Sequence, residues 1–334
     1  MKKFSGPLAA LALFSAACLT AVPAAAQGRK LILATPGIPP IYASLVVYVA
    51  EKEGFFKKYG ADVEIRAFDT GTAAARAVLT GDIQIALAPT PLVITQVSNT
   101  DVPLVAIHGF PNPDWIVGST DPTKTNCKDM AGQSVGVDAV GAARSVALRS
   151  MLLGCPGLKM EDLKQVALSS NTAPAMVAGQ LSFGVLHLED IAVIEAQGKK
   201  VHTVLAMKET NPTSHHLLTT VRLDRLKENR DAYVRTIAAL IDAAKFMQDP
   251  KNADKVAAAA TPTGLSPPIA KAALSQFLDA NYWVHENDGL DVKKLTAVAA
   301  TMKRLGSIQA DKEPVKFERL VDQSIWKDAK AMVK

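Results

Sequence analysis

Two neighbouring stretches of the sequence read Ala50-Glu-Lys-Glu-Gly-Phe-Phe-Lys-Lys-Tyr-Gly-Ala-Asp-Val-Glu-Ile-Arg66 and Ala77-Val-Leu-Thr-Gly-Asp-Ile-Gln-Ile-Ala-Leu-Ala-Pro-Thr90. Each predicts a helix that a glycine ends, followed by a strand. Each strand then runs into a loop of small polar residues, and such loops are where an open α/β sheet holds a ligand. These stretches therefore favour an α/β fold with a ligand site at the ends of its strands.

The same alternation continues along the chain and divides it in two. Strands are expected at 30–34, 62–68, 83–88 and 102–108, and the pattern restarts near Asp129. We therefore expect two lobes, each a mostly parallel sheet flanked by helices, with a ligand cleft between them. The proline-containing segment 109–114 is expected to cross between the lobes and 217–221 to cross back. This assigns 27–116 and 222–334 to lobe 1, and 117–221 to lobe 2.

The chain begins with a predicted secretory signal peptide over residues 1–26. Lys2 and Lys3 give a positive start, residues 8–22 are apolar, and the alanines 24–26 form a small-residue cleavage site. A lipid-modified Cys18 is the alternative, although the sequence before it lacks the leucine usual three residues upstream. We expect cleavage near Ala26 and export of the protein.

Composition argues against two classes of partner. Cleavage removes two lysines and no acids, so the formal net charge falls from +5 to +3. The chain has no run of Lys and Arg of the kind that nucleic-acid binders show. No later stretch approaches the roughly 18 apolar residues of a membrane helix.

Two cysteines follow the predicted signal, Cys127 and Cys155. A strand is expected at 133–138 and a helix at 142–153, and such a helix ends near the start of its strand. Because an exported protein meets an oxidising compartment, we expect a disulfide between the two. Two buried free thiols are the alternative.

Five segments spread over the mature chain carry a resemblance to a known family. They are Glu53-Gly-Phe-Phe-Lys-Lys-Tyr-Gly60, Leu79-Thr-Gly-Asp-Ile-Gln-Ile-Ala86, Lys128-Asp-Met-Ala-Gly-Gln-Ser-Val-Gly136, Asn281-Tyr-Trp-Val284 and Val321-Asp-Gln-Ser324. In their order and spacing the chain resembles the periplasmic solute-binding proteins of ABC importers, in the subgroup that takes up nitrate, alkanesulfonates, taurine and thiamine-type pyrimidines.

The resemblance implies a periplasmic binding protein type II fold, whose lobes close over a small-molecule ligand. It also implies an ABC permease in the inner membrane as partner, a periplasmic location and a monomer. The chain departs from the family where Gln84 replaces the usual Asp, and where the stretch from Gly179 to Asp190 replaces a Gly-x-x-Asp-Ala pattern. The second departure lies on the side of the expected cleft.

Helix starts provide the first candidate ligand contacts. Their free backbone N–H groups and partial positive charge bind anions, and glycine allows a ligand to approach closely. Ordinary helix capping is the alternative role. The candidates of this kind are Thr70, Gly71, Thr72, Thr90 and Gly141.

Other candidates carry side-chain chemistry. Arg144 can bind a carboxylate or sulfonate with two hydrogen bonds, unless it is solvated or paired with Asp138. Trp115 can stack on a flat ligand, or simply pack at the hinge. The pair His215 and His216 is expected to face solvent. The remaining candidates are Thr35 and Gly37 in the proline-rich loop, Tyr42 after it, Asn112 at the crossing, and His187 and Glu189 at the end of a second-lobe strand.

Catalytic and metal motifs are weak. Gly132-Gln-Ser-Val-Gly136 matches the G-x-S-x-G pattern of a hydrolase, but Ser134 precedes its strand instead of following it. The sequence contains no H-E-x-x-H or C-x-x-C motif, so we expect no metal and no cofactor. The sequence therefore predicts a non-catalytic receptor for a small anionic or heteroaromatic nutrient. An enzyme on the same scaffold, either hydrolase or pyrimidine-synthase-like, and a chemosensory subunit are the alternatives.

Overall fold

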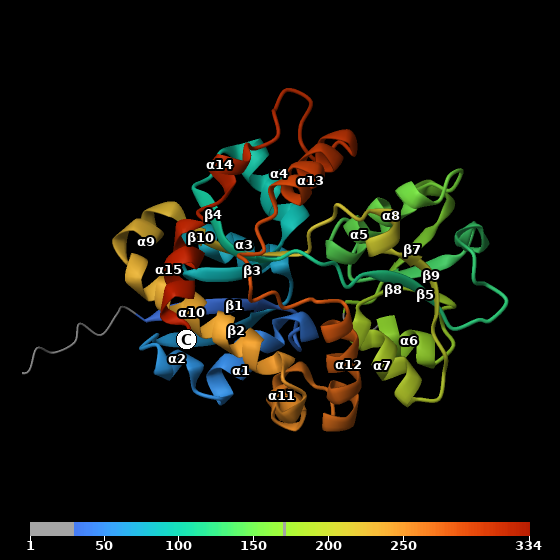
Figure 1. The fold of residues 1–334 in the computed structure, drawn as a ribbon. Helices are drawn as coiled ribbons and strands as arrows, with labels where there is room; N and C mark the ends of the chain where they lie inside the picture. The colour runs from blue at the N-terminus through green and yellow to red at the C-terminus, as the bar shows by residue number, and fades with distance from the viewer. Residues whose placement is uncertain (1–29, 170–171) are drawn as a thin grey trace, which may run out of the picture.

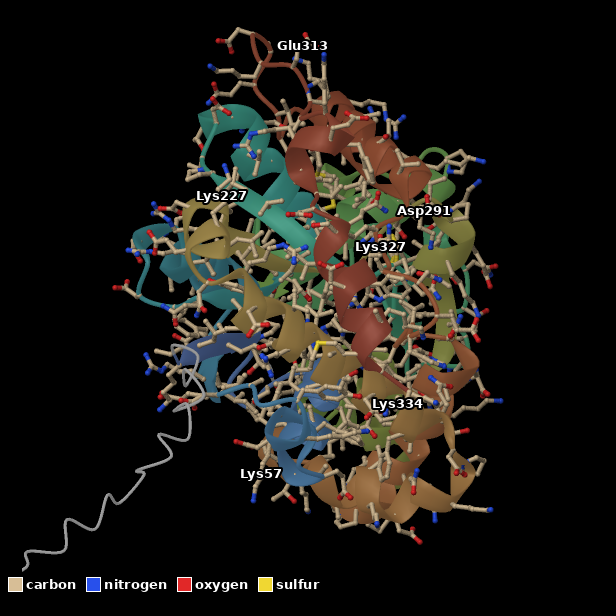
Figure 2. All side chains as sticks on the ribbon, turned by 60° about the vertical axis from the view of Figure 1, so that its left-hand side comes forward. Lys57, Lys227, Asp291, Glu313, Lys327 and Lys334 are labelled. Carbon is tan, nitrogen blue, oxygen red and sulfur yellow. A yellow bond between two sulfur atoms is a disulfide. The ribbon has the colours of Figure 1, made fainter. Side chains whose placement is uncertain are left out.

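The computed structural model describes residues 30–169 and 172–334, which form two α/β lobes (Figure 1). The predicted signal peptide lies outside the described residues. Across the part of the chain that is described, no helix combines the length and the apolar character needed to span a membrane. Charged side chains of both signs point outward, among them Lys227, Asp291 and Lys327 (Figure 2).

The first sheet forms the core of lobe 1. Its β1 strand pairs in parallel with both neighbours, and only β10 runs antiparallel to the strands beside it. In spatial order the strands are β2 (Val63–Phe68), β1 (Leu31–Pro36), β3 (Ile85–Pro89), β10 (Leu217–Arg222) and β4 (Leu104–Phe110).

The second sheet repeats this arrangement in lobe 2. Three strands are parallel, β5 is antiparallel to both of its neighbours, and β9 closes the sheet. In spatial order the strands are β7 (Lys164–Ala167), β6 (Ser134–Val137), β8 (Phe183–Leu186), β5 (Ile116–Ser119) and β9 (His202–Ala206). The expected mostly parallel sheets are confirmed.

Helices cover the faces of both sheets. Those of lobe 1 are α1 (Leu45–Lys52), α2 (Phe55–Lys58), α3 (Gly71–Thr80), α4 (Thr90–Thr100), α9 (Leu223–Glu228), α10 (Arg230–Gln248), α11 (Ala253–Ala259), α12 (Pro267–Asp279), α13 (Val292–Arg304), α14 (Phe317–Leu320) and α15 (Ser324–Met332). Those between β5 and β10 are α5 (Ala143–Met151), α6 (Thr172–Val177), α7 (Leu188–Ala196) and α8 (Met207–Thr210).

The second crossing differs from the sequence-based expectation. Residues 217–221 were expected to cross back, but they belong to β10, which pairs with β3 and β4. Leu217, Leu218 and Val221 are apolar and fully buried in this position, which explains why they join the sheet. The two sheets are therefore connected by residues 111–115 and 207–216.

Alternate residues of the strands build different cores on the two faces of the first sheet. Ile85 and Leu87 of β3 pack with α1 and α10, whereas Ala86 and Ala88 belong to the core under α3 and α4. Small alanines let these helices approach closely. The approach is tightest at Gly71, where a Cβ atom would lie 2.3 Å from Cδ of Pro89.

The second sheet uses glycine for the same purpose. Gly136 of β6 faces Gly184 of β8 in the parallel register. A Cβ atom at either position would come within 2.8 Å of Cγ2 of Thr172, which begins α6. The absence of side chains at these two glycines therefore allows α6 to pack directly against the sheet.

A disulfide joins Cys127 to Cys155, which confirms the expected pairing. Cys127 precedes β6, and Cys155 follows the helical segment that α5 begins. The Cα atoms lie 6.2 Å apart, so the bridge fastens the end of this segment to the chain that enters β6.

Candidate functional site

A cleft of about 410 Å³ lies between the two sheets. Residues that follow the carboxyl ends of β1, β2 and β3 line one side, and residues that follow β6, β7 and β8 line the other. Open α/β sheets bind ligands at this edge. The cleft is therefore the candidate functional site.

The wall from lobe 1 consists of a loop and a helix start. Gly37 has φ of +94°, and the loop that it begins places Ile38 and Pro39 on the cleft. Thr70 caps α3 by accepting a hydrogen bond from the Ala73 N–H group at 3.1 Å. Gly71 lies in the same wall.

The wall from lobe 2 contains a helix start that a carboxylate already caps. Asp138 Oδ1 accepts hydrogen bonds from the N–H groups of Ala139 at 2.8 Å and Arg144 at 3.1 Å. The carboxylate of Asp138 therefore already occupies the position beside the start of α5. An anionic ligand would have to compete with this carboxylate.

The charge of Arg144 is also satisfied within the protein. Its guanidinium group donates to a carboxylate oxygen of Asp190 at 2.8 Å and to the backbone oxygen of Val185. The side chains of Arg144 and Asp190 are both almost fully buried. The Arg144 side chain therefore forms its ion pair with Asp190, and not with Asp138 as the sequence-based alternative has it.

Trp115 lies between the cleft and the buried interior of lobe 2. Only 8% of this residue is exposed. Its ring centroid lies 3.7 Å from that of His187, and the Arg144 guanidinium lies 5.8 Å from the Trp115 ring. The indole therefore packs against the imidazole of His187 on one side and lies near the guanidinium group of Arg144.

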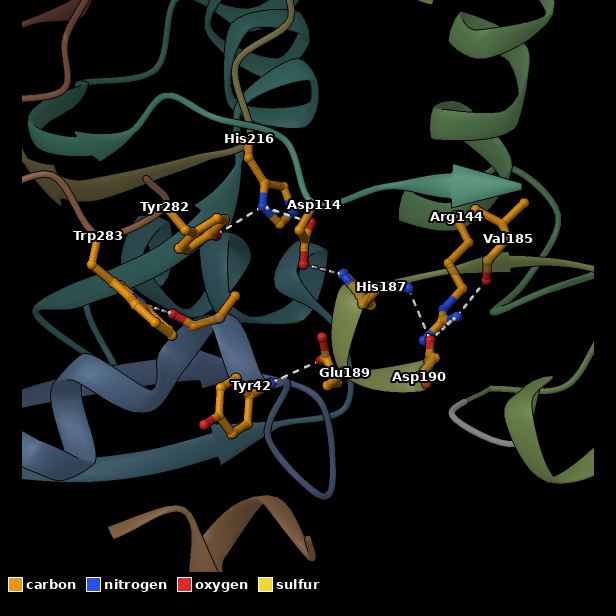
Figure 3. Close-up of polar contacts among 11 residues, drawn as sticks. Tyr42, Asp114, Arg144, Val185, His187, Glu189, Asp190, His216, Tyr282 and Trp283 are labelled. Carbon is orange, nitrogen blue, oxygen red and sulfur yellow. Dashed lines mark hydrogen bonds and ion pairs between the residues drawn. The ribbon is translucent and has the colours of Figure 1, made fainter. Parts of the chain in front are cut away.

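A chain of buried polar side chains lies behind the cleft (Figure 3). Asp114 Oδ2 is 2.7 Å from Nδ1 of His187, and Asp114 Oδ1 is 3.1 Å from Nδ1 of His216. The Tyr282 hydroxyl is 2.8 Å from the same nitrogen of His216. The two segments that connect the sheets contribute Asp114 and His216, so the chain lies at their meeting point.

Burial sets the charge of these groups. Desolvation lowers the pKa of His187 and of His216 to about 4, so both imidazoles are neutral at pH 7. Desolvation raises the pKa of Asp114 to about 6. It also raises the pKa of Glu189 to about 7, and nearby His187 opposes that shift.

The cleft brings together part of the predicted site. The predicted residues that line it are Gly37, Thr70, Gly71, Thr72, Trp115, Arg144 and His187.

The other predicted residues are engaged elsewhere in the structure. The Thr35 hydroxyl bonds that of Tyr48 at 3.0 Å, and the Asn112 amide donates to backbone oxygens of Ala280 and Asn281. Gly141 is exposed beside the cleft with φ of +81°.

Three more predicted residues form interior contacts. The Tyr42 N–H group donates to Glu189 Oε1 at 2.9 Å, which links the two lobes, and Glu189 Oε2 has no hydrogen-bond partner. The Thr90 hydroxyl lies 2.8 Å from Nδ1 of His215. These three residues stabilise the structure around the cleft, but they do not line it.

The expectation that His215 and His216 face solvent is wrong, because both are buried. The Thr90 N–H group donates to the backbone oxygen of His216, and His215 Nε2 lies 2.6 Å from the backbone oxygen of Gly289. These contacts hold the second connecting segment inside the protein. The sequence also gave no signal for Asp114, whose neighbours come from distant parts of the chain.

The two-lobed arrangement with a cleft between the sheets is the fold of periplasmic solute-binding proteins. A solved protein from Bordetella bronchiseptica RB50 matches with a TM-score of 0.73 at 21% identity, over 90% of this chain and 97% of that one. The nitrate-binding protein NrtA from Synechocystis PCC 6803 matches with a TM-score of 0.70 at 14% identity, over 91% and 89%. The alkanesulfonate-binding protein SsuA from Xanthomonas axonopodis pv. citri, bound to MOPS, gives 0.69 at 14% identity, over 89% and 99%.

Sequence comparison identifies the family within this class. The model of the family described as NMT1/THI5 like matches residues 43–253, and the chain belongs to this family. No curated protein sequence matches the chain significantly.

Proposed function

We propose that this protein is the exported solute receptor of an ABC importer and captures a small organic solute between its lobes. The observation that carries the proposal is the cleft of about 410 Å³, which the carboxyl ends of strands from both sheets line. The nitrate- and alkanesulfonate-binding proteins of the same fold support a role in import. The partners are then the solute and an inner-membrane permease, and the protein acts as a periplasmic monomer whose lobes close by a hinge motion.

The cleft favours a flat heteroaromatic solute with hydrogen-bond donors over an anion. Asp69 and Asp138 place carboxylates on the cleft. Among the described residues that line it, Arg144 is the one Lys or Arg, and its charge is paired with Asp190. Trp115 offers an aromatic ring for stacking.

A thermal-shift screen tests the proposal and the solute class together. We expect aminopyrimidines or related heteroaromatic solutes to raise Tm, because selective binding to the folded state stabilises it. Nitrate, sulfonates and aromatic carboxylates form the comparison set. A rise in Tm with anions alone would contradict the solute class, and no rise with any class would contradict the receptor role.

A matched pair of tryptophan variants locates the binding site. Trp115→Leu should weaken binding of the solute at least tenfold, which is about 1.4 kcal/mol, because it removes the stacking ring. Trp326→Leu, in α15 and outside the cleft, should leave affinity unchanged. Isothermal titration calorimetry of the two variants distinguishes these outcomes.

We propose a receptor rather than an enzyme because the cleft offers little catalytic chemistry. Ser134 of the G-x-S-x-G match begins β6 and does not follow the strand, as the hydrolase mechanism requires. The described residues that line the cleft include neither Cys nor Lys. Chromatography of the solute after long incubation with the protein tests this, since any product would favour the enzyme.

A further inference from the structure

We propose that Asp114, His187 and His216 form a binding site for one divalent transition-metal ion, such as Zn²⁺, beside the solute cleft. The inference does not depend on which solute the cleft binds.

The geometry supplies three ligand atoms at one point. One ligand atom from each of Asp114, His187 and His216 lies within 4.8 Å of the other two, and all three residues are buried. Zinc bonds of about 2.0–2.2 Å place neighbouring ligand atoms roughly 3 to 3.5 Å apart. The distance of 3.1 Å from Asp114 Oδ1 to His216 lies in this range, and the distance of 2.7 Å from Asp114 Oδ2 to His187 is slightly shorter.

Hydrogen bonding alone leaves this cluster unsatisfied. Nδ1 of His216 lies next to both the Tyr282 hydroxyl and Asp114 Oδ1, and one ring nitrogen is either a donor or an acceptor. If this nitrogen accepts from Tyr282, its lone pair faces a carboxylate oxygen. If it carries a proton, its single N–H group faces two oxygens, and Asp114 Oδ1 has no hydrogen-bond partner in the structure. A cation that takes a lone pair from each atom resolves the conflict.

The chemistry of the donor set also suits a transition metal. Two imidazoles and one carboxylate form a known zinc-binding combination, and imidazole ligands disfavour Mg²⁺ and Ca²⁺. Each of the three residues offers one ligand atom to a metal ion.

The neighbouring charges favour a divalent cation. Glu189 and Asp190 interact electrostatically with Asp114, and Arg144 is the nearby positive group. This buried set contains three acidic residues and one basic residue. A bound cation would interact favourably with it.

The site would also fix the two connecting segments to each other. Asp114 lies in the first connection, His216 lies in the second, and His187 caps the start of α7 in lobe 2. His187 and His216 line the cleft, so a bound ion would lie at its inner wall. Three protein ligands leave a coordination position, which the Tyr282 hydroxyl or a molecule in the cleft can fill.

The direct test measures metal binding by the tag-free exported protein. After treatment with EDTA and dialysis against ZnCl₂, we expect inductively coupled plasma mass spectrometry to find one equivalent of zinc. Asp114→Asn, His187→Gln and His216→Gln should each weaken zinc affinity at least tenfold by calorimetry. His202→Gln, on the edge strand β9, is the matched control and should bind zinc as the wild type does.

Two results would overturn the proposal. One is a wild-type protein that holds no zinc after dialysis, and the other is zinc affinity that survives the three cluster substitutions. X-ray absorption at the zinc edge of the wild type needs no variant to fold. It should show an oxygen and nitrogen shell with imidazole scattering, and a sulfur or all-water shell would also exclude the site.

Discussion

Arg144 shows how one residue can lie on a binding cleft while its charge is used for stability. The guanidinium group is buried, contacts Asp190 and Val185, and lies over Trp115. Removing one partner of a buried ion pair leaves the other charge without compensation, which is more costly than replacing both. The main effect of a substitution here should therefore fall on folding.

We expect Arg144→Met to lower the free energy of unfolding by about 3–5 kcal/mol. The double variant Arg144→Met with Asp190→Asn should recover part of this loss, because it removes the unpaired buried carboxylate. Urea denaturation of the wild type, both single variants and the double variant measures the coupling. Additive losses in the double variant would contradict a direct ion pair.

His108 predicts how stability changes in acid. This residue is buried and neither ring nitrogen has a hydrogen-bond partner, and desolvation lowers its pKa from 6.5 to about 4. Below pH 6.5 the unfolded chain binds a proton that the folded protein excludes. The contribution of His108 to stability is therefore lost as pH falls from 6.5 towards 4, by up to about 3 kcal/mol.

The variant His108→Leu should have a shallower decline of unfolding free energy between pH 7 and pH 4.5 than the wild type. His202→Leu, on a half-exposed edge-strand residue, should decline as the wild type does. Urea denaturation across this pH range, with EDTA present, measures both slopes. Equal slopes for His108→Leu and the wild type would show that His108 has the same pKa in the folded and unfolded states.

Residue-level prediction from sequence succeeded where local chain geometry decides the outcome. Thr70, Gly71 and Thr72 begin a helix after a strand, and this local pattern places them on the cleft. The sequence could not reveal that Asp138 caps α5 or that Asp190 pairs with Arg144. Such contacts depend on how α5 packs against β8 and α7, which no local pattern encodes.

At the scale of elements, apolar patterning and glycine stops located the strands well. The apolar pattern of 217–221 predicts an extended segment, but it does not distinguish a sheet strand from a connection between lobes. Its place in the first sheet depends on antiparallel pairing with β3 and β4, which are more than one hundred residues earlier in the chain. Pairing over that distance has no signature in the segment itself.

The packing of α3 on β3 gives a prediction at this scale. Gly71→Ala would place a Cβ atom 2.3 Å from Cδ of Pro89, and a proline ring cannot rotate away. We expect a loss of about 1–3 kcal/mol in unfolding free energy. Thr72→Ala, at the next and exposed position, should cost less than about 0.5 kcal/mol. Thermal unfolding compares the two, and equal Tm values would mean that α3 shifts freely.

At the scale of the whole molecule, two exposed apolar side chains flank the cleft. Ile38 of lobe 1 is 57% exposed and lines the cleft, and Val140 of lobe 2 is 68% exposed beside Asp138 and Ala139. Removing apolar side chains from water is favourable, so their position at the cleft can contribute to closure. We expect lobe closure over a solute to bury both.

The double variant Ile38→Ser with Val140→Ser should bind the solute about 10- to 100-fold more weakly, which is about 1.4–2.7 kcal/mol. Leu153→Ser is the control, because Leu153 is 45% exposed and does not line the cleft. Calorimetry with the solute that gives the largest rise in Tm measures all three proteins. Unchanged affinity of the double variant would mean that these side chains stay apart in the bound form.

The first and last strands of the second lobe, β5 and β9, are neighbours in its sheet. Ile116, where β5 begins, lies opposite Ala206, where β9 ends. The chain thus enters and leaves this lobe at adjacent points, and the bridge between Cys127 and Cys155 lies wholly inside the intervening segment. Segments with neighbouring ends tolerate insertion and excision well. We expect residues 115–211, which include Trp115 and Met207 of the lobe 2 core, to be transferable into another host protein through a short linker.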